Sequence, residues 1–342
     1  MAKLLRWGFL GAARIARDAI LPALVTNGVG RPAAIAARNR ERANEIAKAF
    51  GIERIYDAYR DVVDAPEIDA IYIGLPNSAH AEWIRAGAEA GKHVLCEKPI
   101  SLAAAELDGV MDIAAAKGVM VQEALMVWTH PRWLRIRELI RSGRIGELRA
   151  VQARFGFWSR DPGNIRNRAD LGGGGLLDLG IYLVSMARFV LEREPKRALA
   201  LVDRDPDFMT DRMASFLLDF PGAQGSLVCS TQIALNQRFI VLGTRGSIEV
   251  ELPFTPPAAA QTRILIASTP VETNQLTEAI EMIDPVDQYA TELAAFADAV
   301  AGKRSPAVPL LSSIANMRVL DALNASARSG SWESIAGSRT TL

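Results

Sequence analysis

The chain has 342 residues, of which 49% are hydrophobic and 23% are charged, a composition typical of a globular protein large enough for two domains. Lys and Arg together number 39, as do Asp and Glu, so the formal net charge of zero gives no electrostatic argument for nucleic-acid or membrane binding. No stretch approaches the roughly 18 consecutive apolar residues of a spanning helix, and no leader pattern stands at the N-terminus, so we expect a cytoplasmic protein.

The first predicted element is a strand at 4–10 that runs into a glycine-led turn and a helix. In a dinucleotide-binding fold, the first glycine of such a turn permits the sharp bend, and later small residues admit the diphosphate at the helix N-terminus. Gly11 keeps the first role, whereas Ala13 and Ala16 stand where the second and third glycines usually lie, so the motif is degenerate. Pro22 is expected to bend the helix near its end. The residues expected to contact the cofactor are Gly11, Ala12, Ala13, Arg14 and Ile15.

The second strand is expected at 31–37, followed by a helix at 40–50 that Asn39 caps. An NAD site usually places Asp or Glu between these elements to bond the ribose hydroxyls, but this chain offers Arg38, Asn39 and Arg40. A guanidinium such as that of Arg38 can bond a 2′-phosphate with two hydrogen bonds and stack on adenine. We therefore favour NADP as cofactor, with NAD as the alternative; the competing interpretation is that both arginines are only solvated.

A third predicted strand, at 68–74, ends in the segment Leu75-Pro76-Asn77-Ser78-Ala79-His80. Pro76 ends the strand at the crevice where ligands of an open α/β sheet bind. Asn77 is placed to cap the following helix and to bond a cofactor ribose. His80 is expected to pack or cap rather than to catalyse. The cofactor-site residues assigned here are Leu75, Pro76, Asn77 and His80.

The next strand, at 93–97, is continuously apolar at its centre and suits an inner parallel strand. Lys98 falls where this strand stops, and Pro99 restricts it to an extended conformation. Because the carboxyl ends of parallel strands face the ligand-binding crevice, Lys98 is expected to face a reacting ligand in that crevice rather than bulk solvent. Glu97 is its nearest candidate partner, and both residues are assigned to the cofactor site. The alternative is that Lys98 is a solvent-exposed residue at the end of the strand with no role in function.

Strands and helices continue to alternate, with a helix expected at 103–116 and a strand at 119–123. This alternation predicts an α/β protein whose N-terminal part is a Rossmann-type, doubly wound parallel sheet.

The pattern changes after a helix at 131–141. Strand-like segments then dominate and predict a C-terminal α+β domain with a large, mostly antiparallel open sheet. An open sheet face often serves oligomer contacts, so we expect a homodimer or homotetramer. The predicted domains are 1–125, 126–285 and a set of C-terminal helices at 286–330 that pack across both. The predicted strands are 148–158, 198–203, 213–220, 226–233, 238–242 and 247–252, and the late helices are 289–300 and 310–327.

Four glycines, Gly172 to Gly175, lead into a predicted helix that carries Asp178 and Tyr182. These two residues and Ser185 are spaced i, i+4 and i+7, so they share one face. The glycines would let the helix start approach a cofactor or substrate closely. The alternative has Asp178 simply favoured at a helix N-terminus and Tyr182 half buried with its hydroxyl satisfied.

The few cysteines and histidines give no metal site. Cys96 and Cys229 are the only cysteines and are expected to be reduced, buried thiols. His80, His93 and His130 share no ligand spacing with each other or with the cysteines, so we expect no structural zinc.

Four motifs in this order resemble the Gfo/Idh/MocA oxidoreductases: Gly11 to Ala16, Leu75 to His80, Gly91 to Pro99 and Gly172 to Tyr182. In that family the Glu-Lys-Pro lysine and an Asp…His or Asp…Tyr pair flank the nicotinamide. The tyrosine here resembles the branch that contains NADP-dependent xylose dehydrogenases, dimeric dihydrodiol dehydrogenases, glucose-fructose oxidoreductase and sugar-nucleotide 3-ketoreductases. The chain departs from the family pattern at two places. Ala13 stands where the second glycine of the turn is usual. Val127 and Trp128 stand where the family commonly has an aromatic residue followed by an arginine.

The resemblance implies reversible hydride transfer between nicotinamide C4 and a carbinol carbon of a sugar, sugar derivative or dihydrodiol. Tyr182 would exchange the hydroxyl proton; because a free tyrosine has a pKa near 10, the cation of Lys98 would stabilise its phenolate. Asp178 would orient a substrate hydroxyl, and no metal is required. The alternatives are a non-catalytic cofactor-binding sensor on the same fold and a glycosidase that uses nicotinamide transiently.

Overall fold

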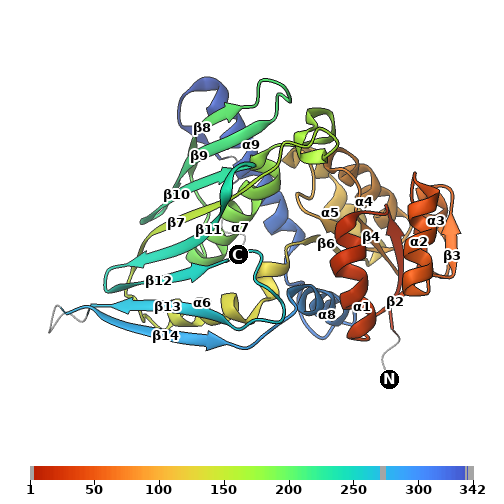
Figure 1. The fold of residues 1–342 in the computed structure, drawn as a ribbon, viewed down its shortest axis with the longest axis horizontal. Coiled ribbons are helices and arrows are strands. Elements are labelled where there is room, and N and C mark those ends of the chain that lie inside the picture. The colour runs from red at the N-terminus through yellow and green to blue at the C-terminus, as the bar shows by residue number, and fades with distance from the viewer. Residues whose placement is uncertain (1–3, 270–274, 336, 338–342) are drawn as a thin grey trace. The chain divides into compact units, whose positions relative to one another are not determined.

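The computed structural model describes residues 4–269, 275–335 and 337. The chain divides into two compact units, each built from two separate stretches of sequence. The first unit contains Met1–Thr129 and Asp287–Ser313, and the second contains His130–Val286 and Ile314–Leu342. Figure 1 colours the chain by residue number, so each unit combines segments of different colour. The late helix α8 (Gln288–Val300) therefore belongs to the first unit, and most of α9 (Leu310–Ser329) belongs to the second.

The first unit is built on a parallel sheet of six strands in the order β3-β2-β1-β4-β5-β6. The order reverses between β1 and β4, which confirms the doubly wound Rossmann arrangement (Figure 1). All four residues of β4 are buried, as expected for an inner strand covered on both faces. The strands are β1 (Arg6–Leu10), β2 (Arg31–Ala36), β3 (Arg54–Tyr56), β4 (Ala70–Ile73), β5 (His93–Glu97) and β6 (Val121–Ala124).

The helices of the first unit cover both sides of this sheet. Leu293 and Phe296 of α8 join a buried cluster with Trp7 of β1, and the Trp7 and Phe296 rings lie 5.1 Å apart. A segment near the C-terminal end of the chain thus completes the core of the N-terminal unit. The other helical segments are η1 (Ala16–Ile20), α1 (Leu21–Thr26), α2 (Arg40–Phe50), α3 (Tyr59–Asp64), η2 (Asn77–Ala79), α4 (His80–Glu89), η3 (Ala104–Leu107), α5 (Val110–Lys117) and η4 (Met126–Thr129).

Several local predictions for this unit need correction. The helix expected at 103–116 is split into η3 and α5, because Gly109 takes a left-handed conformation that interrupts it. The irregularity near Pro22 is a π-helical turn, η1, just before α1; proline has no N–H to give to the preceding turn and crowds it. Asn77 begins η2 rather than flanking α4, whose N-cap position is held by Ala79. The short elements β3 and α3 were not expected.

The second unit contains a sheet of nine strands in the order β14-β13-β12-β11-β7-β10-β9-β8-β15. Neighbouring strands pair antiparallel except β7 with β10, so the prediction of a large, mostly antiparallel sheet is confirmed. The expected strand at 226–233 is instead divided between β10 and β11, and β13 and β14 were not expected. The strands are β7 (Leu148–Trp158), β8 (Arg197–Arg204), β9 (Asp211–Phe220), β10 (Ala223–Ser230), β11 (Gln232–Gly243), β12 (Gly246–Glu251), β13 (Thr262–Ser268), β14 (Thr277–Ile283) and β15 (Glu333–Ser334).

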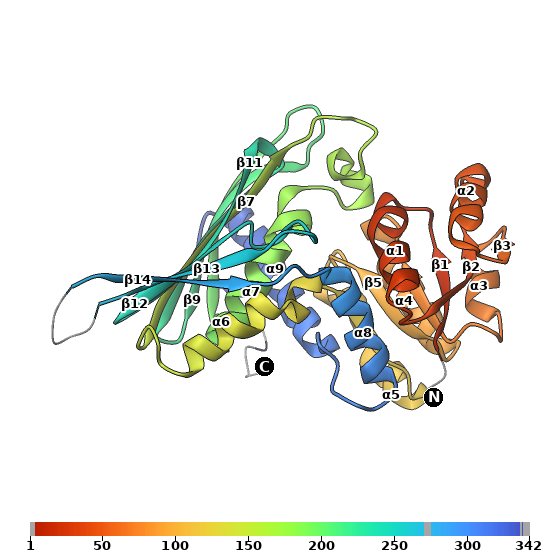
Figure 2. The same ribbon diagram turned by 60° about the horizontal axis from the view of Figure 1, so that its bottom comes forward.

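Helices α6 (Pro131–Arg141), α7 (Ile181–Leu191) and α9 lie on one side of this sheet and leave the other side without helices (Figure 2). The π-helical segment η7 (Leu176–Gly180) leads directly into α7, and η5 (Ile165–Asn167) and η6 (Ala169–Leu171) precede it. The helical run Ala169–Leu191 is long and apolar enough to cross a membrane, but 94% of its most apolar window is buried inside the structure. Every residue of α7 is buried, so this run is a core helix of the second unit.

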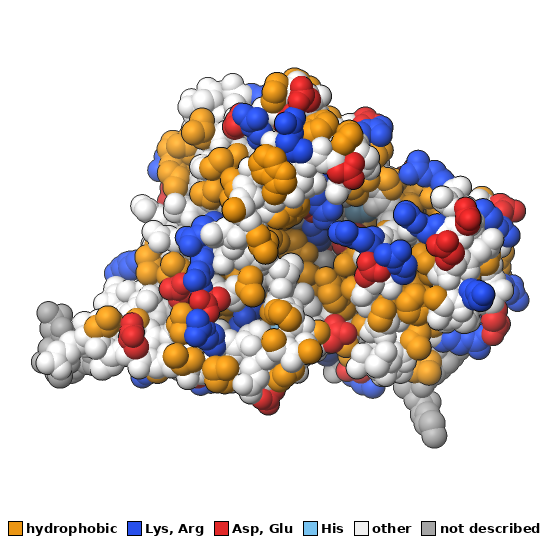
Figure 3. Space-filling view, viewed as in Figure 1, with side chains coloured by type: hydrophobic (Ala, Val, Ile, Leu, Met, Phe, Trp, Pro, Cys, Tyr) orange, Lys and Arg blue, Asp and Glu red, His pale blue; other side chains and the backbone are white. Residues whose placement is uncertain are grey.

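The charged side chains are mixed over the surface. In Figure 3, basic and acidic groups are interspersed on the face shown, in keeping with 39 residues of each kind. The surface therefore shows no large patch of one sign on that face of the kind that nucleic acids select.

Candidate functional site

Gly11 ends β1 and makes the turn into the first helix. Its φ is +97°, a left-handed conformation that favours glycine, and a Cβ there would lie 2.7 Å from the carbonyl oxygen of Gly74, just after β4. The amide of Gly74 in turn donates to the Leu10 carbonyl at 3.0 Å. The ends of β1 and β4 are thus locked together at the point where the strand order reverses, which is where an open α/β sheet binds dinucleotides.

The two alanines of the degenerate motif occupy different environments. A Cβ on Gly74 would meet the Ala13 methyl group at 3.3 Å, so this methyl lies beside a residue that has no side chain. Ala16 is 1% exposed and belongs to the core cluster, so a small apolar side chain suits the close packing of helix and sheet. Arg14, between them, is exposed. The turn retains its shape despite the missing glycines.

Arg38, Asn39 and Arg40 follow β2 and are all exposed. The Asn39 side chain accepts a hydrogen bond from the Arg42 amide at 2.9 Å, so the predicted cap of α2 is confirmed. Arg40 forms an ion pair with Asp57. No ion pair involves Arg38 among the residues that the structure describes. The two arginines therefore differ, since Arg40 is paired with a carboxylate and Arg38 is not.

His80, at the start of α4, is fully buried. Its Nδ1 lies 2.8 Å from the Pro99 carbonyl oxygen and its Nε2 lies 2.9 Å from the Leu75 carbonyl oxygen. Burial lowers the pKa of His80, so the ring is neutral and donates to only one of the two oxygens. The histidine joins the loops that follow β4 and β5, and any effect on a cofactor acts through these loops.

Lys98 follows β5 directly and is partly buried. Its loop is fixed at two further points, because His80 contacts Pro99 and the Ile100 amide donates to the Glu123 carboxylate at 3.0 Å. Strand register places Cys96, two residues before Lys98, beside Ile73, and Ile73 beside Leu10. Lys98 therefore lies at the same carboxyl edge of the sheet as the Gly11 turn.

Glu97, the other residue assigned beside Lys98, accepts a hydrogen bond from the Tyr72 hydroxyl at 2.7 Å. Burial, reinforced by the Glu97 charge, raises the pKa of Tyr72, so this hydroxyl stays protonated and donates. Glu292 of α8 is also buried, and burial together with the charges of Glu97 and Glu123 raises its pKa. This group of three neighbouring carboxylates, Glu97, Glu123 and Glu292, was not predicted.

In the second unit, the glycine-rich turn is packed against the chain itself. A Cβ on Gly173 would lie 2.5 Å from the Arg166 carbonyl oxygen, and a Cβ on Gly174 would lie 1.9 Å from Oδ1 of Asp211. The close approach that these glycines permit is therefore to neighbouring protein groups, and in the described structure no ligand is needed to explain it. Gly174 also has a φ of +121°.

Asp178 and Tyr182 lie one helical turn apart on η7 and α7. Nε of Arg166 donates to Oδ2 of Asp178 at 2.5 Å, and the Asp178 side chain is 10% exposed. The Tyr182 ring is 6% exposed and packs on Phe155 and Phe254, with ring centres 5.8 and 5.5 Å away. Aromatic walls of this kind exclude water from most of the phenol.

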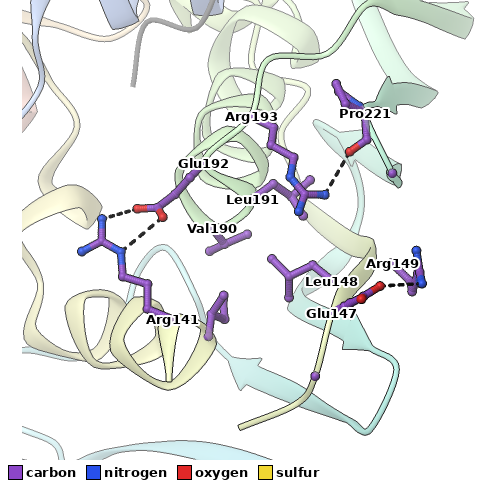
Figure 4. A pocket seen from close by; sticks show the side chains of 12 residues that line it. Arg141, Glu147, Leu148, Arg149, Val190, Leu191, Glu192, Arg193 and Pro221 are labelled. Carbon is purple, nitrogen blue, oxygen red and sulfur yellow. Dashed lines mark hydrogen bonds and ion pairs between the residues drawn. The ribbon is translucent and has the colours of Figure 1, made fainter. Parts of the chain in front are cut away.

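A separate cavity of about 460 Å³ lies at the C-terminal ends of α6 and α7, away from these residues (Figure 4). Its charged groups satisfy one another: Arg141 pairs with Glu192, and Arg149 pairs with Glu147 at 2.7 Å. Arg193 donates to a main-chain carbonyl oxygen at 2.9 Å. None of the predicted site residues lines this cavity.

The structure thus gathers the predicted site residues into two groups. The carboxyl edge of the first sheet holds the Gly11 turn, the arginines after β2, the loop after β4 and Lys98, whereas Asp178 and Tyr182 belong to the second unit. Sequence reasoning missed Arg166, Phe155, Phe254, Tyr72 and Asp211. An arginine shortly before the glycine run was the only local signal among them, since the others reach the site through long-range contacts.

A parallel sheet with a glycine turn at its reversal point is the arrangement of dinucleotide-binding folds. Residues 5–125 match the model of the oxidoreductase family with an NAD-binding Rossmann fold, and residues 133–249 match the GFO/IDH/MocA C-terminal domain. The chain belongs to the Gfo/Idh/MocA family, as its motifs predicted, and it is an NAD(P)-dependent oxidoreductase.

Similar proteins cover nearly the whole chain. An uncharacterised oxidoreductase of Rhizobium meliloti is 40% identical over 97% of this chain and 99% of its own length. The NADP-dependent D-xylose 1-dehydrogenase 2 of Haloferax volcanii is 36% identical over 95% of this chain and 98% of its own. Among solved structures, a 3-ketoreductase from Actinomadura kijaniata in complex with NADP and TDP-benzene is 29% identical and superimposes with a TM-score of 0.86, covering 95% of this chain and 98% of that one.

Proposed function

We propose that the chain catalyses the reversible oxidation of a carbinol group of a sugar, sugar derivative or dihydrodiol with NADP, which supplies or accepts a hydride at nicotinamide C4. Relatives named as an NADP-dependent xylose dehydrogenase, a dideoxyglucose 3-reductase and a dihydrodiol dehydrogenase support this substrate class. The observation that carries the proposal is the position of Lys98 on the carboxyl edge that also holds the Gly11 turn.

The residues of the first unit fit a dinucleotide. The Gly11 turn leaves no room for a side chain and opens a helix without a side-chain cap, so its amides can receive a diphosphate. Arg38, exposed after β2, is the group we assign to the 2′-phosphate of NADP. Arg40 is less suited to this role because it already pairs with Asp57.

The proposed proton path uses Tyr182 as general acid and base. In the oxidation direction its phenolate oxygen takes the carbinol proton while the C–H bond gives up its hydride, and the product is a carbonyl group. The Lys98 ammonium stabilises the phenolate by its charge. Asp178, fixed by Arg166, accepts a hydrogen bond from a neighbouring substrate hydroxyl and thereby orients the substrate.

The test is a panel of aldoses, polyols and dihydrodiols, beginning with D-xylose, assayed at 340 nm with NADP and with NAD. We expect Lys98→Met and Tyr182→Phe to lower kcat about 10²–10⁴-fold with little change in NADPH affinity, since general acid–base groups contribute this much. Wild-type turnover in either variant would refute the assigned role. Tight NADPH binding without turnover of any compound would favour a sensor, and hydrolysis without net cofactor reduction would favour a glycosidase.

We also propose that copies of the chain associate through the helix-free face of the second sheet as a homodimer or homotetramer. Strand register places Leu201, Leu217 and Ile280 on that face, with exposed fractions of 78%, 42% and 57%. Exposed apolar side chains on an open sheet favour association. Light scattering should show a dimer or larger species, and a monomer at micromolar concentration would contradict the proposal.

A further inference from the structure

The carboxylate of Asp211 lies against the first turn of the helix that carries Asp178 and Tyr182. Asp211 begins β9 and is 8% exposed. Its Oδ2 accepts a hydrogen bond from the Leu176 amide at 2.6 Å. On the other side of the carboxylate, a Cβ on Gly174 would come within 1.9 Å of Oδ1, so only glycine fits there. The Asp211 carboxylate therefore fills the space that a side chain at position 174 would need.

This contact holds the segment from which both proposed active-site residues project. The Gly174 carbonyl oxygen accepts from the Asp178 amide at 3.2 Å, and the helix runs without interruption to Leu191. A negative charge at a helix N-terminus is favourable because it faces unpaired amide groups and the positive end of the helix dipole. Loss of the charge would loosen Leu176, two residues before Asp178.

We propose that Asp211 is a positioning residue for Asp178 and Tyr182, whose ionised carboxylate locks the glycine-rich turn and whose protonation releases it. The inference rests on the proposed roles of Asp178 and Tyr182. Asp211 is not assigned a contact with the reacting atoms, and its effect passes through the Leu176 amide.

The lock is expected to respond to pH in the physiological range. Burial raises the pKa of Asp211 to about 6, partly offset by the hydrogen bond from Leu176. The other groups near it are Arg204 on β8, whose charge favours ionisation, and Cys229 on β10, a buried thiol whose pKa is raised by burial and by the charges of Asp211 and Asp178. Asp211 is therefore ionised and locks the turn above about pH 6, and it becomes neutral and releases the turn as the pH falls below that value.

Hydrogen exchange of the full-length protein tests the lock without any need for turnover. We expect the Leu176 amide, corrected for intrinsic exchange, to lose at least tenfold protection in the wild type as the pH falls from 7.5 to 5. In Asp211→Asn, protection should be low and independent of pH. The control Asp207→Asn, at an exposed loop position, should keep the wild-type response. Protection that is pH-independent in the wild type, or unchanged in Asp211→Asn, would overturn the proposal.

Kinetics test the positioning role. With the fastest substrate of the panel, we expect the kcat of the wild type to fall at acid pH with an apparent pKa near 6. In Asp211→Asn this acid-side fall in kcat should be absent. The kcat of the variant at pH 7.5 should be about tenfold lower than that of the wild type, with little change in the KM for NADPH. If Asp211→Asn does not fold, the pH dependence of Leu176 amide protection in the wild type, which needs no variant, decides the proposal. An acid limb that persists in Asp211→Asn overturns the positioning role. Wild-type turnover in Tyr182→Phe would instead refute the assigned role of Tyr182, and NADPH binding without turnover of any compound in the panel would refute the proposed function.

Discussion

Each unit of this protein starts a helix with a left-handed glycine, but the two turns are used differently. Gly11 has no side chain because a carbonyl oxygen of the neighbouring strand lies 2.7 Å from where its Cβ would be, and the helix that follows has no side-chain cap. Gly174 has none because the Asp211 carboxylate occupies that position. The first helix start has no side-chain cap and is the one we propose for the cofactor diphosphate, whereas the second already holds the Asp211 carboxylate. A glycine run before a helix therefore does not identify a ligand site until its nearest anion is known.

The largest effect is expected from Gly174→Ala. The new methyl group would require a left-handed alanine and would collide with Asp211, so we expect a loss of about 2–4 kcal/mol in the free energy of unfolding. Gly175→Ala is the matched control, because its Cβ would lie 3.4 Å from the nearest atom and its φ of −71° is helical. Urea denaturation of both variants compares them directly, and equal stabilities would show that Asp211 does not restrict this turn.

Gly11→Ala should affect the cofactor as well as the fold. The added methyl group would clash with the Gly74 carbonyl oxygen and distort the turn. We therefore expect NADPH affinity to fall about 10–100-fold, which is a loss of about 1.4–2.8 kcal/mol in binding free energy. Gly28→Ala serves as control, because Gly28 also has a positive φ, +61°, but no atom within 4 Å of the added Cβ. Fluorescence titration with NADPH should leave the control unchanged; a similar loss in both variants would assign the effect to backbone strain alone.

Arg38→Ser sharpens the comparison at the open turn by removing the group assigned to the 2′-phosphate. We expect the preference for NADPH over NADH to fall about tenfold, since a charge-assisted contact to phosphate contributes roughly 1.5–3 kcal/mol at most. Arg40→Ser should change it less, because Arg40 is paired with Asp57. Dissociation constants for both cofactors decide this, and an unchanged ratio in Arg38→Ser would exclude that arginine from cofactor selection.

Inorganic diphosphate should give the smallest effect. At a concentration about tenfold above its dissociation constant, binding to the open turn would add about 1.4 kcal/mol and raise the Tm by a few degrees. The shift should vanish in Gly11→Ala and persist in Asp211→Asn, because the second helix start is closed by protein. If the rise in Tm were lost in Asp211→Asn instead, diphosphate would bind at the second helix start, and our assignment of the anion site to the Gly11 turn would be wrong.

The sequence allowed the sheet of the first unit to be predicted because its inner strands are short apolar runs between helices. The run before Glu97 is one example, and β4 is another. The strand β14 was missed because it is an edge strand whose side chains are half or fully exposed, so burial imposes no alternation on it. The strand β13 was missed although its burial alternates, with Ile264 and Ile266 in the core. Lys98, Asp178 and Tyr182 could be named from local motifs. Asp211 could not, since its contact with Leu176 spans 35 residues and depends on the fold.

The placement of α8 also bears on how the protein is made. Leu293 and Phe296 complete the core around Trp7, yet they are synthesised long after the six strands of the first sheet. While the ribosome is still adding the second unit, α8 is missing from the core around Trp7, so we expect the nascent chain to stay partly folded or protected until residue 313 has emerged. A cloned fragment that stops at Thr129 would carry the same exposed surface, and it is expected to aggregate rather than bind a nucleotide.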